Sequence, residues 1–291
     1  MRIRWWSRAS AVGALAGALW FGVQATSTRA TTMVQLSLDQ LVQASSDVVR
    51  GRAIAQQSTW NVQRTEIVTL TTIAVEQAVK GQAAGTIVVE QPGGRVGSYR
   101  VGVPGTVHFQ PNTSYVLFLE PAPPEPQQSA PHYLVVGLLQ GAYRIYADAV
   151  TGEERLIRPM GGVVYRSAES QNLTADTLPL RDLRAEVESV LRTPLVIPAG
   201  VRLPLMVVRT ASEGAGRLHV EAQTTVPLFP NARLALPAGS SVEGEATLVD
   251  STWKIRWNSV SVRGKRAPFT GTSELTAGES LTGMKVVVEA R

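Results

Sequence analysis

The sequence has no cysteine among its 291 residues and only three histidines. Without cysteine there are no disulfide bonds, thiolate metal sites, cysteine nucleophiles or bacterial lipid anchor. His108, His132 and His219 lie far apart and lack the short spacing of paired metal ligands. The zinc motif HExxH, the GxSxG nucleophile elbow and the phosphate-binding GK[ST] ending are also absent. We therefore expect no cofactor, no metal site and no catalytic residue of a known type.

Acidic residues are missing from the first 38 positions, where an apolar run over residues 11–23 follows three arginines. Small residues then form cleavage sites that end at Ala25 or at Ala30. A spanning helix needs about 20 apolar residues, and this shorter run favours a cleaved signal over a membrane anchor. We predict an export signal at residues 1–30, a periplasmic or extracellular location, and no transmembrane span after cleavage.

Little net charge remains once the signal is removed. The whole sequence has 28 basic and 23 acidic residues, and four of the basic residues lie in the predicted signal. A nearly neutral chain gives no overall electrostatic reason to expect nucleic acid or an anionic membrane as a partner.

Short runs of β-branched residues separated by turns dominate residues 31–165. Ser37 is a good N-cap for one short helix. Loops at 92–105, with five glycines, and 121–131, with five prolines, separate the later runs. The predicted strands include 66–79, 86–90, 107–109, 115–119, 132–137 and 142–146. One helix and about seven strands predict a small closed barrel.

The clearest helical pattern covers residues 176–192, inside a predicted linker at 166–194. Leu180, Leu183 and Val187 recur at helical spacing, and charged residues take the opposite face. We predict a helix at 178–192 that joins the first domain to a second β domain.

Residues 195–291 form the predicted second domain, a barrel or sandwich made of strands and turns. The tripeptide Pro-Ala-Gly occurs at 198–200 and again at 237–239. Proline fixes φ and glycine supplies a positive φ, so each copy predicts a turn. The two copies indicate two equivalent corners of one β fold.

The strand over 252–263 separates apolar from basic side chains. Two tryptophans and Ile255 alternate with Lys254 and Arg256, which places them on opposite faces. A stacking platform for bases or sugars would mix cations and aromatics on one surface, so this pattern favours core packing of the tryptophans. A change of phase predicts a bulge near Ser259.

Two groups of surface residues are candidates for contacts with a partner. The first is Arg95, Tyr99 and Arg100 in the glycine-rich loop, for which a solvated hairpin loop is the alternative. The second is the basic face of Lys254 and Arg256. The carboxylate pairs Glu153–Glu154 and Glu243–Glu245 are interpreted as solvated surface groups, not as acid–base pairs.

Several turn-and-strand motifs of the second domain occur in order along the chain. They are the turns at 197–200 and 236–239, the stretch Val-Glu-Gly-Glu at 242–245, the tryptophan strand at 253–257 and the hairpin at 263–267. In this order, residues 195–275 resemble the C-terminal periplasmic barrel of the conjugal-transfer scaffold proteins of type IV secretion. That family has a membrane-spanning helix and a helical antenna in its barrel. Here a predicted cleavable signal stands in place of the first, and no helix is predicted within 195–291 for the second. The resemblance therefore implies the fold and not the role of a secretion channel.

A second set of motifs lies in residues 38–146. Its members are the stretches 46–51, 79–81, 91–94, 115–119 and 136–137. The layout is similar to a domain at the start of various exported bacterial proteins, some of them associated with secreted metalloproteases. It also resembles the OB-like fold of netrin and protease-inhibitor domains. The resemblance implies an OB-like binding module in the predicted domain 31–165.

Three functions are compatible with these patterns. The first is an exported, non-enzymatic binding or scaffold protein that recognises a protein or an envelope component. The second is a component of a conjugation or type IV secretion-like apparatus. The third is a secreted hydrolase with an unrecognised site, which would use His108 or His132 with a nearby carboxylate. The missing catalytic motifs favour the first hypothesis.

Overall fold

The computed structural model describes residues 32–124, 131–158, 164–166, 177–214, 216–231, 233–276 and 280–291. The predicted signal at 1–30, and parts of the proline-rich loop and of the predicted linker, lie outside these residues. Strands make up 57% and helices 11% of the structure, so the prediction of a mostly β protein is confirmed. No helix in the described part of the chain is both long and apolar enough to cross a bilayer.

The first sheet closes on itself as a barrel. Its ring consists of β2 (Asp47–Trp60), β3 (Ile67–Lys80), β4 (Thr86–Pro92), β8 (His132–Val135) and β7 (Ser114–Pro121), which returns to β2. All neighbours are antiparallel except β4 and β8. Strands β9 (Ala142–Ala147), β10 (Glu154–Ile157) and β12 (Thr177–Pro179) extend the sheet from β7.

Strand β7 explains how this sheet is stabilised on both sides. Its residues 115–119 form a continuous buried apolar run, typical of a strand covered on two faces. Leu117 and Leu119 join the cluster inside the barrel, whereas Val116 and Phe118 join a second cluster under the helices.

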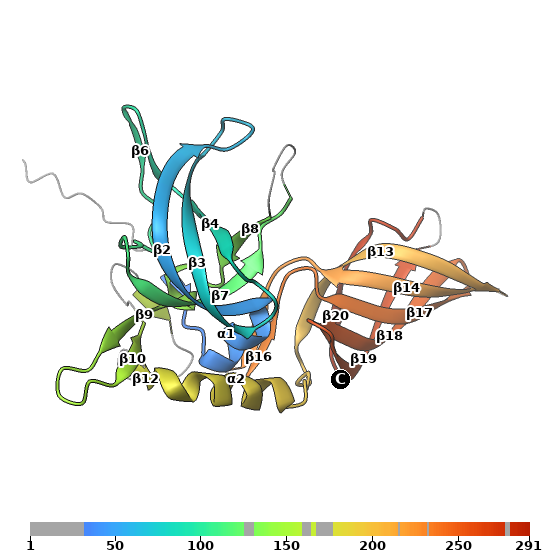
Figure 1. The fold of residues 1–291 in the computed structure, drawn as a ribbon. Coiled ribbons are helices and arrows are strands. Elements are labelled where there is room, and N and C mark those ends of the chain that lie inside the picture. The colour runs from blue at the N-terminus through green and yellow to red at the C-terminus, as the bar shows by residue number, and fades with distance from the viewer. Residues whose placement is uncertain are drawn as a thin grey trace, which may run out of the picture.

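Two helices cover the base of the first sheet (Figure 1). Helix α1 (Leu38–Ala44) begins with the predicted cap, because Ser37 and Gln40 form a reciprocal capping box. Helix α2 (Leu183–Arg192) follows a short 3-10 turn, η2 (Leu180–Asp182). Val187 is fully buried in the same cluster as α1, so α2 belongs to the core of the first sheet.

The second sheet has six antiparallel strands. They are β13 (Arg202–Gly214), β14 (Arg217–Thr224), β17 (Ser241–Val249), β18 (Thr252–Val262), β19 (Lys265–Thr276) and β20 (Lys285–Glu289), in the order β19-β18-β17-β14-β13-β20. Its two edges meet where the backbone N–H of Arg291 donates to the carbonyl of Thr270 at 2.8 Å, so this sheet is nearly closed.

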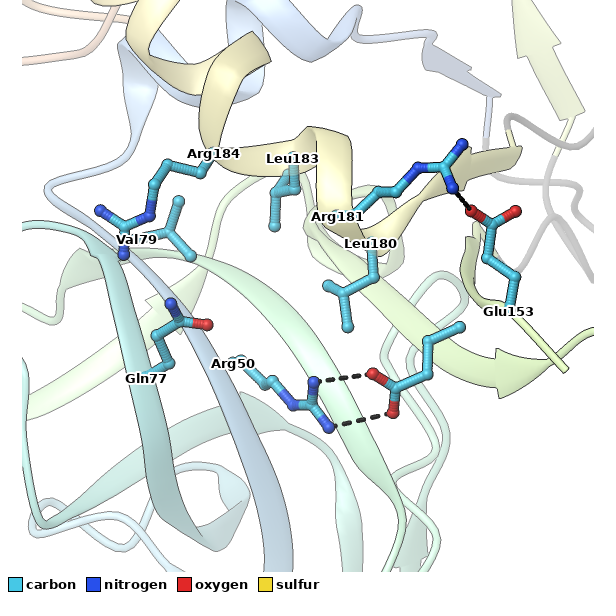
Figure 2. Close-up of a pocket in the computed structure, with 9 residues that line it drawn as sticks. Arg50, Gln77, Val79, Glu153, Leu180, Arg181, Leu183 and Arg184 are labelled. Atoms are coloured by element: carbon cyan, nitrogen blue, oxygen red, sulfur yellow. Dashed lines mark hydrogen bonds and ion pairs between the residues drawn. The ribbon is translucent and has the colours of Figure 1, made fainter.

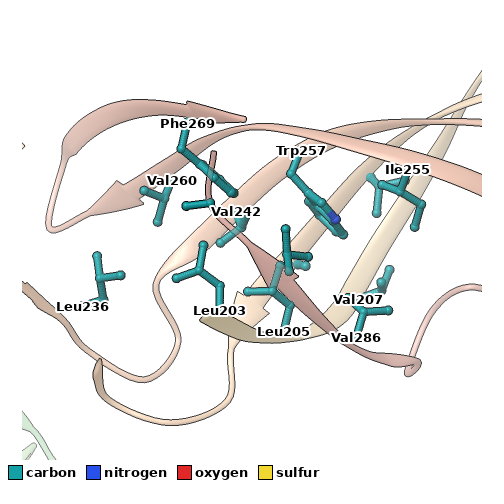
Figure 3. Packing of buried hydrophobic residues seen from close by; sticks show 14 of the residues in the cluster. Leu203, Leu205, Val207, Leu236, Val242, Ile255, Trp257, Val260, Phe269 and Val286 are labelled. Carbon is teal, nitrogen blue, oxygen red and sulfur yellow. The ribbon is translucent and has the colours of Figure 1, made fainter. Parts of the chain in front are cut away.

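The core of the second sheet lies around Trp257 (Figure 3). Trp257 is fully buried together with Ile255, and its indole Nε1 donates to the hydroxyl of Ser273 at 3.0 Å. The predicted core role of this tryptophan is therefore confirmed. The predicted bulge is present as well, because Asn258 is skipped in the register with both neighbouring strands.

The two Pro-Ala-Gly corners have the same geometry. Gly200 and Gly239 have φ angles of 82° and 80°. The backbone N–H of Gly200 donates to the carbonyl of Ala290, and that of Gly239 donates to the carbonyl of Thr224. The prediction of two equivalent turns is confirmed.

Two hairpins of the C-terminal part contact the helices. The hairpin of β15 (Leu228–Asn231) and β16 (Leu234–Leu236) lies on α1, where the Gln43 side chain donates to the Arg233 carbonyl at 2.6 Å and accepts from the Ala235 amide at 2.9 Å. The β18–β19 hairpin brings Arg263 to the Ala44 carbonyl at the end of α1. It also brings Lys265 to carbonyls at the end of α2. Cations here satisfy the free carbonyls and oppose the helix dipoles.

The remaining short elements lie at the margins of the first sheet. They are β1 (Thr32–Val34), which pairs in parallel with β11 (Val164–Arg166), the 3-10 helix η1 (Leu138–Gly141), and a hairpin of β5 (Gly94–Val96) and β6 (Tyr99–Val101).

Candidate functional site

The β5–β6 hairpin contains three of the predicted partner-binding residues and extends from one end of the barrel (Figure 1). Two glycines allow it to leave β4 and lie against β2 and β3. Gly94 has a φ of 137°, and a Cβ there would approach the hydroxyls of Ser58 and Thr69 to 2.4 Å. Gly93 has a φ of 91°, and its carbonyl accepts from the Thr69 hydroxyl at 2.6 Å. The glycine-rich loop therefore forms an ordered hairpin fixed to the barrel.

One face of this hairpin is apolar. Cross-strand pairs alternate between the two faces, so Val96, Tyr99 and Val101 share a face with Gly94. The Tyr99 ring packs edge-on against Trp60 at the end of β2, with ring centroids 5.6 Å apart. Tyr99 nevertheless remains 64% exposed, and Val101 is exposed beside it. An aromatic pair with a large accessible surface is typical of a contact site.

The other face of the hairpin has two arginines. Arg95 and Arg100 lie directly opposite each other in the register. Both side chains are exposed, and the Arg95 guanidinium donates to the Gly97 carbonyl at 3.3 Å. In the described part of the chain, no carboxylate oxygen lies within ion-pair distance (4.0 Å) of either arginine. The structure thus brings Arg95, Tyr99 and Arg100 onto one exposed hairpin, with the ring on one face and the two guanidinium groups on the other. We call this hairpin, together with Trp60, the hairpin surface.

Lys254 and Arg256 lie elsewhere, on the exposed face of β18 in the second sheet. Arg256 is 3.5 Å from the carboxylate of Glu245, which lies opposite it on β17. Lys254 lies opposite Glu274 on β19. Their charges are balanced by neighbouring strands, and the structure does not bring them to the hairpin surface.

A pocket of about 410 Å³ lies between β2, β3, the start of β10 and α2 (Figure 2). Arg50 on β2 donates to both oxygens of Glu154, at 2.9 and 3.1 Å, and to Glu76 at 2.9 Å. On the opposite rim, Arg181 lies 2.8 Å from Glu153. Every carboxylate in this pocket therefore has its own guanidinium partner.

The charges around the pocket reinforce one another. A hydrogen bond to Glu154 is the main reason why the pKa of Arg50 is raised. Burial acts to raise the pKa of Glu76, but the hydrogen bonds and charges of Arg52 and Arg50 together lower it below its ordinary value. Both shifts favour the charged forms, so this pocket is an ion-pair network that attaches β10 and η2 to the barrel.

The three histidines lie apart from one another, and one of them has a carboxylate beside it. His132 on β8 is 2.8 Å from the Glu90 carboxylate on β4, His108 is exposed in a loop, and His219 lies on β14 of the second sheet. Among the described residues no group of three or more histidine, aspartate and glutamate side chains has a metal-binding arrangement.

Trp60 and the Arg50 network were not identified from the sequence. Trp60 ends a strand that contacts the hairpin more than thirty positions later in the chain, and no local pattern signals such a contact. A comparison of the chain with protein-family models, curated proteins and solved structures finds no match.

Proposed function

We propose that this chain is an exported, non-enzymatic binding protein whose hairpin surface contacts a protein of the bacterial envelope or exterior. The observation that carries this proposal is the exposed Tyr99, which packs against Trp60 on one face of a hairpin. The other face of the same hairpin has two arginines with no carboxylate partner among the described residues. Aromatic and arginine side chains contribute most of the binding energy in protein interfaces. A rigid barrel that presents them on a fixed hairpin loses little conformational entropy on binding.

The topology of the first sheet supports the resemblance to OB-like modules. The ring runs β2-β3-β4-β8-β7 with one parallel pair, and a helix precedes it. Five-stranded barrels of the OB type commonly use their loops for binding. This layout favours a binding module over an enzyme.

The second candidate function, a part of a secretion-like envelope apparatus, rests on the two equivalent corners of the second sheet. It predicts that the purified protein forms rings or co-purifies with an envelope complex. A monomer found only in the culture medium would exclude this candidate.

The test of the main proposal is a pull-down from envelope and medium fractions with the purified chain and two variants. Tyr99→Ala removes the exposed ring of the hairpin surface. Val150→Ala is the matched control, because Val150 is 94% exposed and lies between β9 and β10. We expect one protein to be retained by the wild type and the control and to be lost with Tyr99→Ala. A partner retained equally by all three chains would refute the role of the hairpin surface.

A further inference from the structure

We propose that the hairpin surface recognises an extended acidic segment of a polypeptide, which adds as a strand beside β6 and places its carboxylates against Arg95 and Arg100. This inference rests on the proposed function and specifies the chemistry of the partner. Three observations carry it: the arginine pair, the open edge of β6 and the separation of the two faces of the hairpin.

The arginine pair has no carboxylate partner, among the described residues, that would offset its repulsion. Like charges directly opposite each other on neighbouring strands are destabilising. Most other arginines of the two sheets have a carboxylate nearby: Arg50 contacts Glu76 and Glu154, and Arg256 contacts Glu245. Arg95 and Arg100 face each other, and neither has such a neighbour in the part of the chain that the structure describes. A ligand that carries carboxylates would relieve this repulsion, and the free energy so released would favour binding.

The edge of β6 provides backbone groups for a partner strand. Among the described residues β6 pairs with β5 alone, and all three of its residues are exposed. An extended peptide can add to such an edge through main-chain hydrogen bonds. Gly97 and Gly102, on either side of β6, leave open space in which a second backbone can approach.

The two faces of the hairpin then determine the sequence pattern of the segment. Alternate side chains of an added strand point to opposite faces. One set would meet Arg95 and Arg100, and the other would meet Tyr99 and Val101. The pattern that fits is acidic and apolar residues in alternation. A phosphate group or a lipid headgroup would use the arginines but neither the apolar face nor the strand edge.

The experiment measures binding of a fluorescent peptide with alternating glutamate and valine residues to the purified chain, by fluorescence anisotropy. Three chains are compared: the wild type, Arg95→Gln with Arg100→Gln, and Arg202→Gln with Arg209→Gln. The last pair is the matched control, because it removes the same charge from an exposed strand face of the second sheet. Phosphatidylglycerol vesicles, heparin and a peptide with lysine in place of glutamate are measured alongside.

We expect the glutamate peptide to bind the wild type and the control equally and to bind the hairpin variant at least tenfold more weakly. Raised salt should weaken the binding, and the lysine peptide should not bind. Equal affinity in all three chains would overturn the proposal, as would no binding to the wild type. Arginine-dependent binding of vesicles or heparin without the peptide would overturn it in favour of those ligands. If the pull-down partner depends on Tyr99 while the peptide does not bind, the proposed function stands and this inference fails.

Discussion

The pocket beside β2 and the β5–β6 hairpin both gather arginines, but only the pocket surrounds them with carboxylates. Arg50 makes three hydrogen bonds to two glutamates. Arg95 and Arg100 face each other, and no described glutamate or aspartate pairs with either of them. The same side chain therefore serves two purposes. Neutralised arginines attach one element to another, and arginines without a counter-ion are available to a partner.

The surface of β18 provides an intermediate case within the same chain. Its Lys254 and Arg256 resemble the hairpin arginines in the sequence, because both groups are cations beside apolar residues. In the fold, however, β17 and β19 place Glu245 and Glu274 opposite them. The difference between the two surfaces arises from strand register.

Lys80 is a third kind of cation site, because its partners are backbone carbonyls and not carboxylates. Its ammonium donates to the carbonyls of Val42 and Ser45 at 2.6 Å, and burial lowers its pKa to about 8, with the charge of Arg263 acting in the same direction. The unfolded chain thus binds a proton more tightly than the native chain. The free energy of unfolding should rise between pH 8 and 10.5, by on the order of 3 kcal/mol.

The measurement is urea unfolding, followed by tryptophan fluorescence, of the wild type, Lys80→Met and the exposed control Lys254→Met. Lys265, whose pKa is also lowered by burial, titrates in all three chains, so its contribution cancels in the comparison. The rise should be smaller in Lys80→Met than in the wild type and should persist undiminished in the control. The same rise in all three chains would contradict the assignment to Lys80.

Gly94→Ala tests how the hairpin is fixed to the barrel. The new Cβ would overlap the hydroxyls of Ser58 and Thr69 at a φ of 137°, so we expect a loss of about 1–3 kcal/mol in unfolding free energy. Gly102→Ala is the control, because its Cβ would meet nothing within 4 Å. Urea titration and the near-ultraviolet circular dichroism of the Trp60–Tyr99 pair provide the readouts. Unchanged spectra and stability in Gly94→Ala would show that this glycine does not set the hairpin position.

Arg50→Gln tests the arginine whose charge is neutralised by two glutamates. Loss of charge-assisted bonds to Glu154 and Glu76 should lower the unfolding free energy by about 1 kcal/mol, because the group is partly exposed. Arg184→Gln, in the same pocket, loses only a 3.4 Å contact with the Ala78 carbonyl and should change stability less. Equal losses in both variants would count against a special role of Arg50.

Acid should weaken the same network. The pKa of Glu76 lies below its ordinary value in the folded chain, so its contribution is fully present above about pH 4.5 and is lost as the pH falls through the lowered pKa. The stability difference between the wild type and Arg50→Gln should therefore shrink in acid, and chemical unfolding at pH 7 and pH 3 measures it. A difference that does not depend on pH would contradict this account.

Local patterns predicted the features that depend on neighbouring residues. The Ser37 cap, the two Pro-Ala-Gly corners, the alternation around Trp257 and the bulge beside it are each encoded within a few positions. The helix predicted at 178–192 is present only from Leu183 on, because residues 178–179 belong to strand β12 and η2 occupies the next three residues.

Contacts between distant strands were not predictable in this way. The parallel pairing of β4 with β8, which closes the barrel, leaves no local signal because residues 93–131 lie between the two strands. For the same reason the sequence did not place Trp60 in the candidate site and did not predict the ion pair of Arg50 with Glu154. The sequence named Arg95, Tyr99 and Arg100 as candidates because of their chemistry and their place in a glycine-rich loop, while their arrangement on two faces required the register of the hairpin.

The most direct test of the account is the unfolding free energy of Arg100→Glu, measured by urea titration beside Arg50→Glu. Glutamate at position 100 would lie opposite Arg95 and replace repulsion with attraction, so we predict a gain of a few tenths to about 1 kcal/mol. The same change at Arg50 breaks its ion pairs and should lower stability. A loss of stability in Arg100→Glu equal to that in Arg50→Glu would contradict the claim that the hairpin arginines lack a counter-ion in the free protein.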